Sequence, residues 1–168
     1  MRSMRVVAAL LAVAVAILMG SSAPAAADEH SHRVQDRVLA AEVCEPMVRE
    51  SVVAAARQSL ASRQQGRWQG SRYTCRYDLG ESGVLLARVR VYDDEAAAVQ
   101  AFAVRRSRVK RPSTLYGIGT GAFQADRGTL LVAKKDNFVL TIDGRALSST
   151  VSPDGVVFSA TRAVFDCW

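Results

Sequence analysis

The chain has 168 residues and a formal net charge of +6, with 49% hydrophobic and 23% charged residues. This composition is typical of a globular protein and excludes a disordered or collagen-like chain. The length corresponds to one domain rather than two, and outside residues 1–30 no apolar run is long enough to span a bilayer.

The N-terminal segment has the layout of a secretory signal peptide. Arg2 and Arg5 form a basic start, residues 6–19 are an unbroken apolar run, and residues 25–27 are small alanines suited to cleavage. Because the run is short for a bilayer span, cleavage is favoured over a permanent anchor. No cysteine follows the run directly, which excludes a lipobox anchor. We predict a signal peptide over 1–27, a flexible N-terminal tail over 28–33 and a single α+β domain over 34–168.

The expected elements follow in chain order from periodicity and from turn and capping residues. A helix is predicted over 46–60, with a proline at its start, and a polar loop over 64–70. Strands over 71–78 and 84–92 are joined by a hairpin connection at 80–83.

The second half of the chain repeats this order. Asp93 is predicted to cap a helix over 94–108, with Val99, Phe102 and Ala103 as its buried stripe. Strands over 129–133 and 138–143 follow, and then a last helix or strand over 156–165. The pattern predicts an α+β fold with helix-strand-strand repeated twice, an antiparallel sheet of about four to six strands and two or three helices on one face.

Three cysteines, Cys44, Cys75 and Cys167, would enter an oxidising compartment after export. An odd number permits at most one intramolecular disulfide, and the sequence alone leaves the pairing open. We favour Cys44–Cys75, because Cys44 precedes the first helix and alternation places Cys75 on one face of the first strand. That bridge would join helix to strand and leave Cys167 free, or paired with a second chain in a disulfide-linked dimer.

The densest run of positive charge lies at the end of the second predicted helix, in Arg105, Arg106, Arg108, Lys110 and Arg111. Such a patch suits an anionic envelope ligand. The alternative is a solvated helix end whose cations complement the helix dipole. Aromatic residues are not interleaved with these cations, so we expect no nucleic-acid partner.

A second candidate ligand surface is the face of the second strand that carries Arg88, Arg90 and Tyr92. A cleft near the glycine-rich residues 117–123 is another. A dinucleotide fingerprint needs a preceding strand and a following helix, which this segment lacks. We therefore interpret its glycines as a turn with positive φ or a close backbone approach.

His30 is a candidate metal ligand if cleavage follows Ala27. The mature chain would then begin Asp28-Glu29-His30, and its amine, two amides and imidazole could form a square-planar nitrogen site for Cu(II) or Ni(II). The alternative is an ordinary tail residue, and we expect no cofactor.

Several short motifs resemble a group of small secreted or lipid-anchored envelope proteins of actinobacteria that share a domain of unknown function. They are Cys44 before a helix, Cys75-x-Tyr77, the Asp-Asp-Glu-Ala helix with Phe102, Gly117-Ile118-Gly119-x-x-Ala122-Phe123, and the hairpin over 130–140. The resemblance spans about residues 35–145 and implies an α+β domain with a Cys44–Cys75 bridge, but no catalytic residues. This chain departs from the group by lacking the lipobox cysteine and by carrying Cys167.

No Gly-x-Ser-x-Gly or His-Glu-x-x-His motif is present, and both histidines, His30 and His32, lie near the N-terminus. We therefore interpret the protein as a secreted, non-enzymatic ligand- or protein-binding domain of the cell envelope, whose only membrane contact is through the signal peptide. The alternatives are an uncharacterised extracytoplasmic enzyme and a structural protein dimerised through Cys167.

Overall fold

The computed structural model describes the backbone of residues 25–62 and 64–168, and the side chains of residues 32–62 and 64–168. The predicted signal peptide falls on residues 1–27, most of which lie outside this range. The elements in chain order are α1 (Ala25–Ala41), η1 (Glu42–Cys44), α2 (Pro46–Ala56), β1 (Gln65–Gln69), β2 (Arg72–Asp78), η2 (Gly80–Ser82), β3 (Gly83–Val91), α3 (Glu95–Ser107), β4 (Ser113–Leu115), β5 (Gly121–Ala125), η3 (Asp126–Gly128), β6 (Leu130–Lys135), β7 (Phe138–Leu147) and α4 (Pro153–Cys167).

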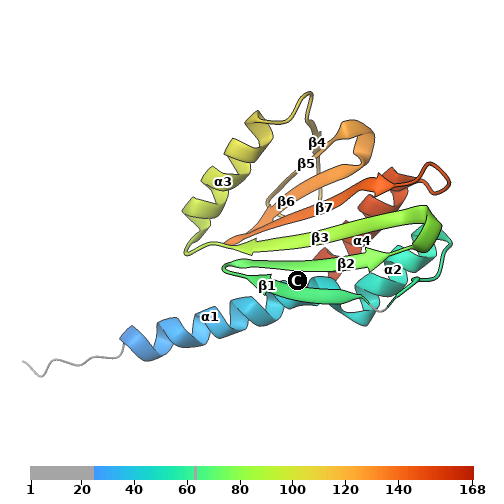
Figure 1. Cartoon of the computed structure of the whole chain (residues 1–168). Coiled ribbons are helices and arrows are strands. Elements are labelled where there is room, and N and C mark those ends of the chain that lie inside the picture. The colour runs from blue at the N-terminus through green and yellow to red at the C-terminus, as the bar shows by residue number, and fades with distance from the viewer. Residues whose placement is uncertain (1–24, 63) are drawn as a thin grey trace, which may run out of the picture.

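One antiparallel sheet organises the described residues, and its strand order is β1-β2-β3-β7-β6-β5-β4 (Figure 1). Two meanders, β1–β3 and β4–β7, meet where β3 pairs with β7. The predicted α+β class with an antiparallel sheet is confirmed. The sheet has seven strands rather than four to six, and each predicted helix-strand-strand unit is longer, with three strands after α2 and four after α3.

The helices cover both faces of the sheet, so the prediction that they pack on one face is wrong. In β6, Leu131 and Ala133 point into a large core shared with α2 and α4. Leu130 and Val132 point to the other face, into a smaller core beneath α3. Figure 1 shows α3 and α4 separated by the sheet. The run of apolar residues in β6 is therefore that of a strand buried on both faces.

The buried stripe of α3 also differs from the prediction. Ala98 is fully buried and Phe102 packs against Phe123 with ring centroids 5.3 Å apart, whereas Val99 is 46% exposed. The helix is rich in alanine, so the sequence leaves the phase of its apolar stripe ambiguous. Asp94, rather than Asp93, caps the helix, and its Oδ1 accepts a hydrogen bond of 2.7 Å from the Ala97 amide.

The strands that sequence analysis missed are the outer ones, β1, β4 and β5. β1 is Gln-Gly-Arg-Trp-Gln, which shows no apolar alternation because it is an edge strand with mostly exposed side chains. A Cβ at Gly66 would collide with the hydroxyl end of the Tyr73 side chain, so glycine leaves room there for this tyrosine. β4 has three residues, too few to show a period.

The described part of the chain begins with a helix that was not predicted. α1 begins at Ala25, so residues 28–33, predicted as a flexible tail, are helical. Ala25-Ala26-Ala27 supplies strong helix formers at its start. The last element, which the sequence left open between helix and strand, is the helix α4. Across residues 25–168, apart from residue 63, no helix is long and apolar enough to cross a bilayer.

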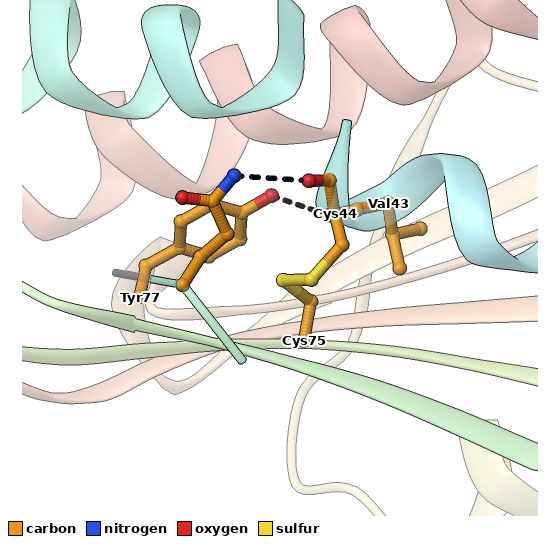
Figure 2. The surroundings of a disulfide bond; sticks show 5 residues. Val43, Cys44, Cys75 and Tyr77 are labelled. Atoms are coloured by element: carbon orange, nitrogen blue, oxygen red, sulfur yellow. Dashed lines mark hydrogen bonds between the residues drawn. A yellow bond between two sulfur atoms is a disulfide. The ribbon is translucent and has the colours of Figure 1, made fainter. Parts of the chain in front are cut away.

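The disulfide Cys44–Cys75 joins η1, just before α2, to the middle of β2, with the Cα atoms 5.4 Å apart (Figure 2). This confirms the favoured pairing. Two hydrogen bonds reinforce the junction: the Tyr77 hydroxyl donates to the Val43 carbonyl, and Gln64 Nε2 donates to the Cys44 carbonyl at 3.1 Å. Desolvation raises the pKa of Tyr77, so this buried hydroxyl remains a donor.

Candidate functional site: an arginine-lined cleft

The sheet places a row of arginines on the face opposite the large core. Along β3, Leu85, Ala87 and Val89 are buried in that core, so Arg88 and Arg90 point the other way. Cross-strand register brings Arg72 of β2 opposite Arg90. Within residues 25–62 and 64–168, α3 packs mainly against β6 and β7, so it lies beside this part of the face.

The wall beside this face is a single stripe of α3. Ala101, Val104, Arg105 and Arg108 recur at the i, i+3, i+4, i+7 spacing that places side chains on one side of a helix. Because α3 is rotated so that Ala98 and Phe102 pack against the sheet, this stripe points toward the open arginine face. Helix and sheet therefore meet at an angle lined with positive charge.

A cleft of about 540 Å³ lies between these surfaces. We call it the arginine cleft, and its lining residues are Arg72, Arg88, Arg90, Tyr92, Ala101, Val104, Arg105, Arg108, Val109, Leu130, Val139, Thr141 and Arg145. Its volume lies in the range of roughly 300–1,000 Å³ that is typical of ligand sites. Arginines predominate among its polar side chains, and no carboxylate is among its lining residues.

Asp143 lies outside the lining of the cleft and neutralises part of its positive charge. Its carboxylate accepts hydrogen bonds from Arg145, at 2.9 Å to Nε and 2.8 Å to Nη2, and from Arg88 Nη1 at 3.2 Å. The hydrogen bonds from Arg145 lower the pKa of Asp143 to about 2, against the opposing effect of burial. Arg145 also lies 3.8 Å from Asp126. Asp143 thus orients two of the arginines and stays ionised.

The other four arginines of the cleft, Arg72, Arg90, Arg105 and Arg108, form no ion pair with a carboxylate in the described part of the chain. Arg90 lies over the Tyr92 ring, 5.1 Å from its centroid. Desolvation, followed by repulsion from Arg88, lowers the pKa of Arg105. The N–H groups of these guanidinium groups can donate hydrogen bonds to an anion. Such charge-assisted hydrogen bonds stabilise the complex.

The structure brings together parts of the two predicted ligand surfaces. Arg105 and Arg108 of the basic run line the same cleft as Arg88, Arg90 and Tyr92 of the strand face. Arg106 instead donates to Thr114 Oγ1 at 2.7 Å. Lys110 and Arg111 follow the end of α3 and are exposed, outside the lining of the cleft.

Sequence analysis missed Arg72, Asp143 and Arg145 as members of this site. Arg72 shares a strand face with Arg76 in Arg-Tyr-Thr-Cys-Arg, a signal that alternation could have supplied. Arg145 was missed because β7 continues to Leu147, beyond the predicted strand end at residue 143.

The glycine-rich segment forms a smaller, separate cleft of about 410 Å³, lined by Gly117, Ile118, Gly119, Thr120, Lys135, Asp136, Arg162, Phe165 and Asp166. Gly117 and Gly119 have φ of 75° and 54°. A Cβ on Gly119 would collide with the Lys134 carbonyl and the Phe165 ring. Positive φ and close approach therefore explain these glycines, and the mixed charge of the lining specifies no ligand.

Two other predicted sites are His30 and Cys167. The side chain of His30 falls outside the described residues, so the copper or nickel site stays a prediction. Cys167 is free, and its Sγ lies 3.7 Å from Met47 Sδ. Partial burial, and then the charge of Glu42, raise the pKa of the Cys167 thiol, which disfavours a reactive thiolate. The dimer through Cys167 also stays a prediction.

Comparison of the chain with family models, with curated proteins and with solved structures finds no match. The function is therefore inferred from the residues of the arginine cleft.

Proposed function

We propose that this protein is an exported, non-enzymatic binding domain of the cell envelope that holds an anionic ligand in the arginine cleft. The observation that carries this proposal is the convergence on one cleft of four arginines, from β2, β3 and α3, that have no carboxylate partner among the described side chains. Arginine is a strong donor to phosphate, sulfate and carboxylate groups but keeps its proton, so it suits binding better than general acid–base catalysis.

The cleft is held open by the fold rather than by the arginines themselves. Arg72 and Arg90 lie directly opposite each other on neighbouring strands, where like charges are destabilising. Hydrophobic packing of α3 on one side and of β3 on the other sets their positions. A site that is kept charged at a cost to stability is consistent with a role in binding.

The disulfide supports export. Cys44 and Cys75 are bonded, and structural disulfides persist in oxidising compartments. Mass spectrometry of the naturally exported protein tests this part of the proposal: we expect a new N-terminus after Ala27 and one intramolecular disulfide. Retention of Met1, or three reduced thiols, would contradict export.

Calorimetric titration with inorganic pyrophosphate tests the binding function. The double variant Arg72→Gln/Arg105→Gln should weaken binding at least about 10-fold, since a hydrogen bond to a charged group contributes roughly 1.5–3 kcal/mol. Raising the salt concentration should weaken binding of the wild-type protein.

The matched control is Arg106→Gln, on the same helix but engaged with Thr114 outside the cleft. We expect it to change the affinity less than about 2-fold, as is usual for a peripheral surface charge. Equal losses in Arg106→Gln and in the double variant would place any binding outside the arginine cleft and refute the proposal.

A further inference from the structure

The lining of the arginine cleft has an apolar part as well as a charged one. Five of its residues are aliphatic, and they come from α3, the segment after it, β6 and β7: Ala101, Val104, Val109, Leu130 and Val139. Cross-strand register continues the row from Arg72 through Arg90 to Val139, so an aliphatic side chain lies next to the two arginines in the lining of the cleft.

The two parts lie at different depths. Leu130 and Val139 are only 4% and 5% exposed, belong to the small core under α3 and form the floor of the cleft. Arg72, Arg90, Arg105 and Arg108 are all exposed and form the rim. A ligand that fills the cleft therefore meets aliphatic side chains inside and guanidinium groups at the opening.

The exposed side chain of Val104 favours a ligand with an apolar part. It is an aliphatic side chain that is 42% exposed on the wall of the cleft, directly before Arg105. Covering such a surface with an apolar group is favourable, at about 0.8 kcal/mol for each buried methylene. An inorganic anion would leave Val104 in water.

We infer that the ligand of the arginine cleft is an amphiphilic phosphate: a phosphate group that the rim arginines bind, attached to an alkyl or acyl chain that lies against Val104 and the floor. This inference rests on the proposed anion-binding function. A phosphate suits the rim because it carries up to two charges and three acceptor oxygens, which several arginine forks can share.

A pair of ligands that differ only in the chain tests the inference. We expect octyl phosphate, below its micellar concentration, to bind at least about 10-fold more tightly than methyl phosphate, a gain that two buried methylenes would supply. Octyl glucoside, which has the chain but no anion, should bind much more weakly than octyl phosphate.

A pair of variants on one helix localises the chain. Val104→Asn should lower the affinity for octyl phosphate several-fold and leave methyl phosphate unchanged. Val99→Asn is the matched control, because Val99 is similarly exposed, at 46%, on the same helix and does not line the cleft. Both sites are on the surface, so both variants should fold, which circular dichroism would verify.

The outcomes separate this inference from the function on which it rests. Equal affinity for methyl and octyl phosphate, both lost in Arg72→Gln/Arg105→Gln, would overturn the amphiphile and keep the anion-binding function. Binding of octyl phosphate that the arginine variant leaves unchanged would overturn both. Equal effects of Val104→Asn and Val99→Asn would also overturn the inference.

The phosphate could come from a bilayer lipid or from a free amphiphile, and vesicles of phosphatidylcholine with phosphatidic acid distinguish the two. Protein that binds these vesicles and is displaced by octyl phosphate would support the inference with a bilayer source. Protein that stays in solution yet binds octyl phosphate would support it with a free source.

Discussion

The two halves of the sheet bury different numbers of faces. The β5–β7 half lies between α4 on one side and α3 on the other, and it buries apolar side chains on both faces. The β1–β3 half is covered on one face only, and its other face carries Arg72, Arg88 and Arg90. The candidate site lies at the boundary, where the cover given by α3 ends and the bare arginine face begins. The comparison shows that the cleft forms where the cover of the sheet ends, so that arginines and aliphatic side chains both line it.

The largest expected change in the free energy of unfolding tests whether the α3 side of the sheet is buried in the β5–β7 half and open in the β1–β3 half. Phe123 and Thr74 lie on the same face of the sheet, but Phe123 is fully buried under α3 and Thr74 is only partly buried, in the uncovered half. Phe123→Ala should lower the free energy of unfolding by about 3–5 kcal/mol, because it leaves a cavity. Thr74→Ala should change it by less than about 0.5 kcal/mol. Chemical denaturation measures both, and similar losses would contradict the comparison.

The second largest change in the free energy of unfolding is expected from the disulfide that joins the start of α2 to the β1–β3 half. Removing the bridge in Cys44→Ala/Cys75→Ala should lower the free energy of unfolding by about 3–4 kcal/mol, given a sequence separation of 31 residues. Cys167→Ala is the control, since this thiol is free and lies at the end of α4. Thermal unfolding without reductant measures both variants. A double variant as stable as the control would show that packing alone holds α2 to β2.

A third, smaller change in stability is expected from Asp143, which lies at the boundary between the two halves of the sheet. Asp143 has an ordinary pKa of 3.8 and a folded-state pKa of about 2. A lowered folded-state pKa means that the ionised carboxylate stabilises the fold above about pH 4, and that this contribution is lost as the pH falls from about 4 through 2. Asp143→Asn should therefore cost about 1–2 kcal/mol at neutral pH and flatten the acid limb of the stability curve.

The control for Asp143 is Asp126→Asn, which removes an exposed carboxylate 3.8 Å from the same Arg145. Exposed pairs contribute little, so this variant should change the stability by less than about 0.5 kcal/mol and keep the acid limb of the wild type. Identical pH profiles for Asp143→Asn and the wild-type protein would show that Asp143 does not hold the boundary.

The smallest effect should be a gain. Arg72→Gln removes a charge that lies directly opposite Arg90, so it should raise the free energy of unfolding by about 0.2–1 kcal/mol at low salt and by less at high salt. Arg67→Gln is the control, because Arg67 is also exposed but lies opposite Thr74. A loss of stability in Arg72→Gln would show that this arginine packs as part of the fold, and would weaken its assignment to binding.

Alternation was enough to predict part of the site. It placed Arg88, Arg90 and Tyr92 on the face opposite Leu85, and the structure puts all three in the cleft. The helix was harder, because in a segment as rich in alanine as 96–103 a shift of one residue changes which face is buried. The predicted stripe through Val99 therefore gave no indication that Arg105 and Arg108 would turn toward the sheet.

The sequence by itself determined the extents of β2, β3 and α3 to within a few residues, because these depend on period, capping or turn chemistry within a short segment. It favoured the α+β class and the Cys44–Cys75 bridge, but it left the pairing of the cysteines open. Only the tertiary structure decided that α3 covers the opposite face from α4 and that β3 pairs with β7. These depend on which apolar surfaces pack together over long separations, and only that packing brings the arginines of α3 into one cleft with those of β2 and β3.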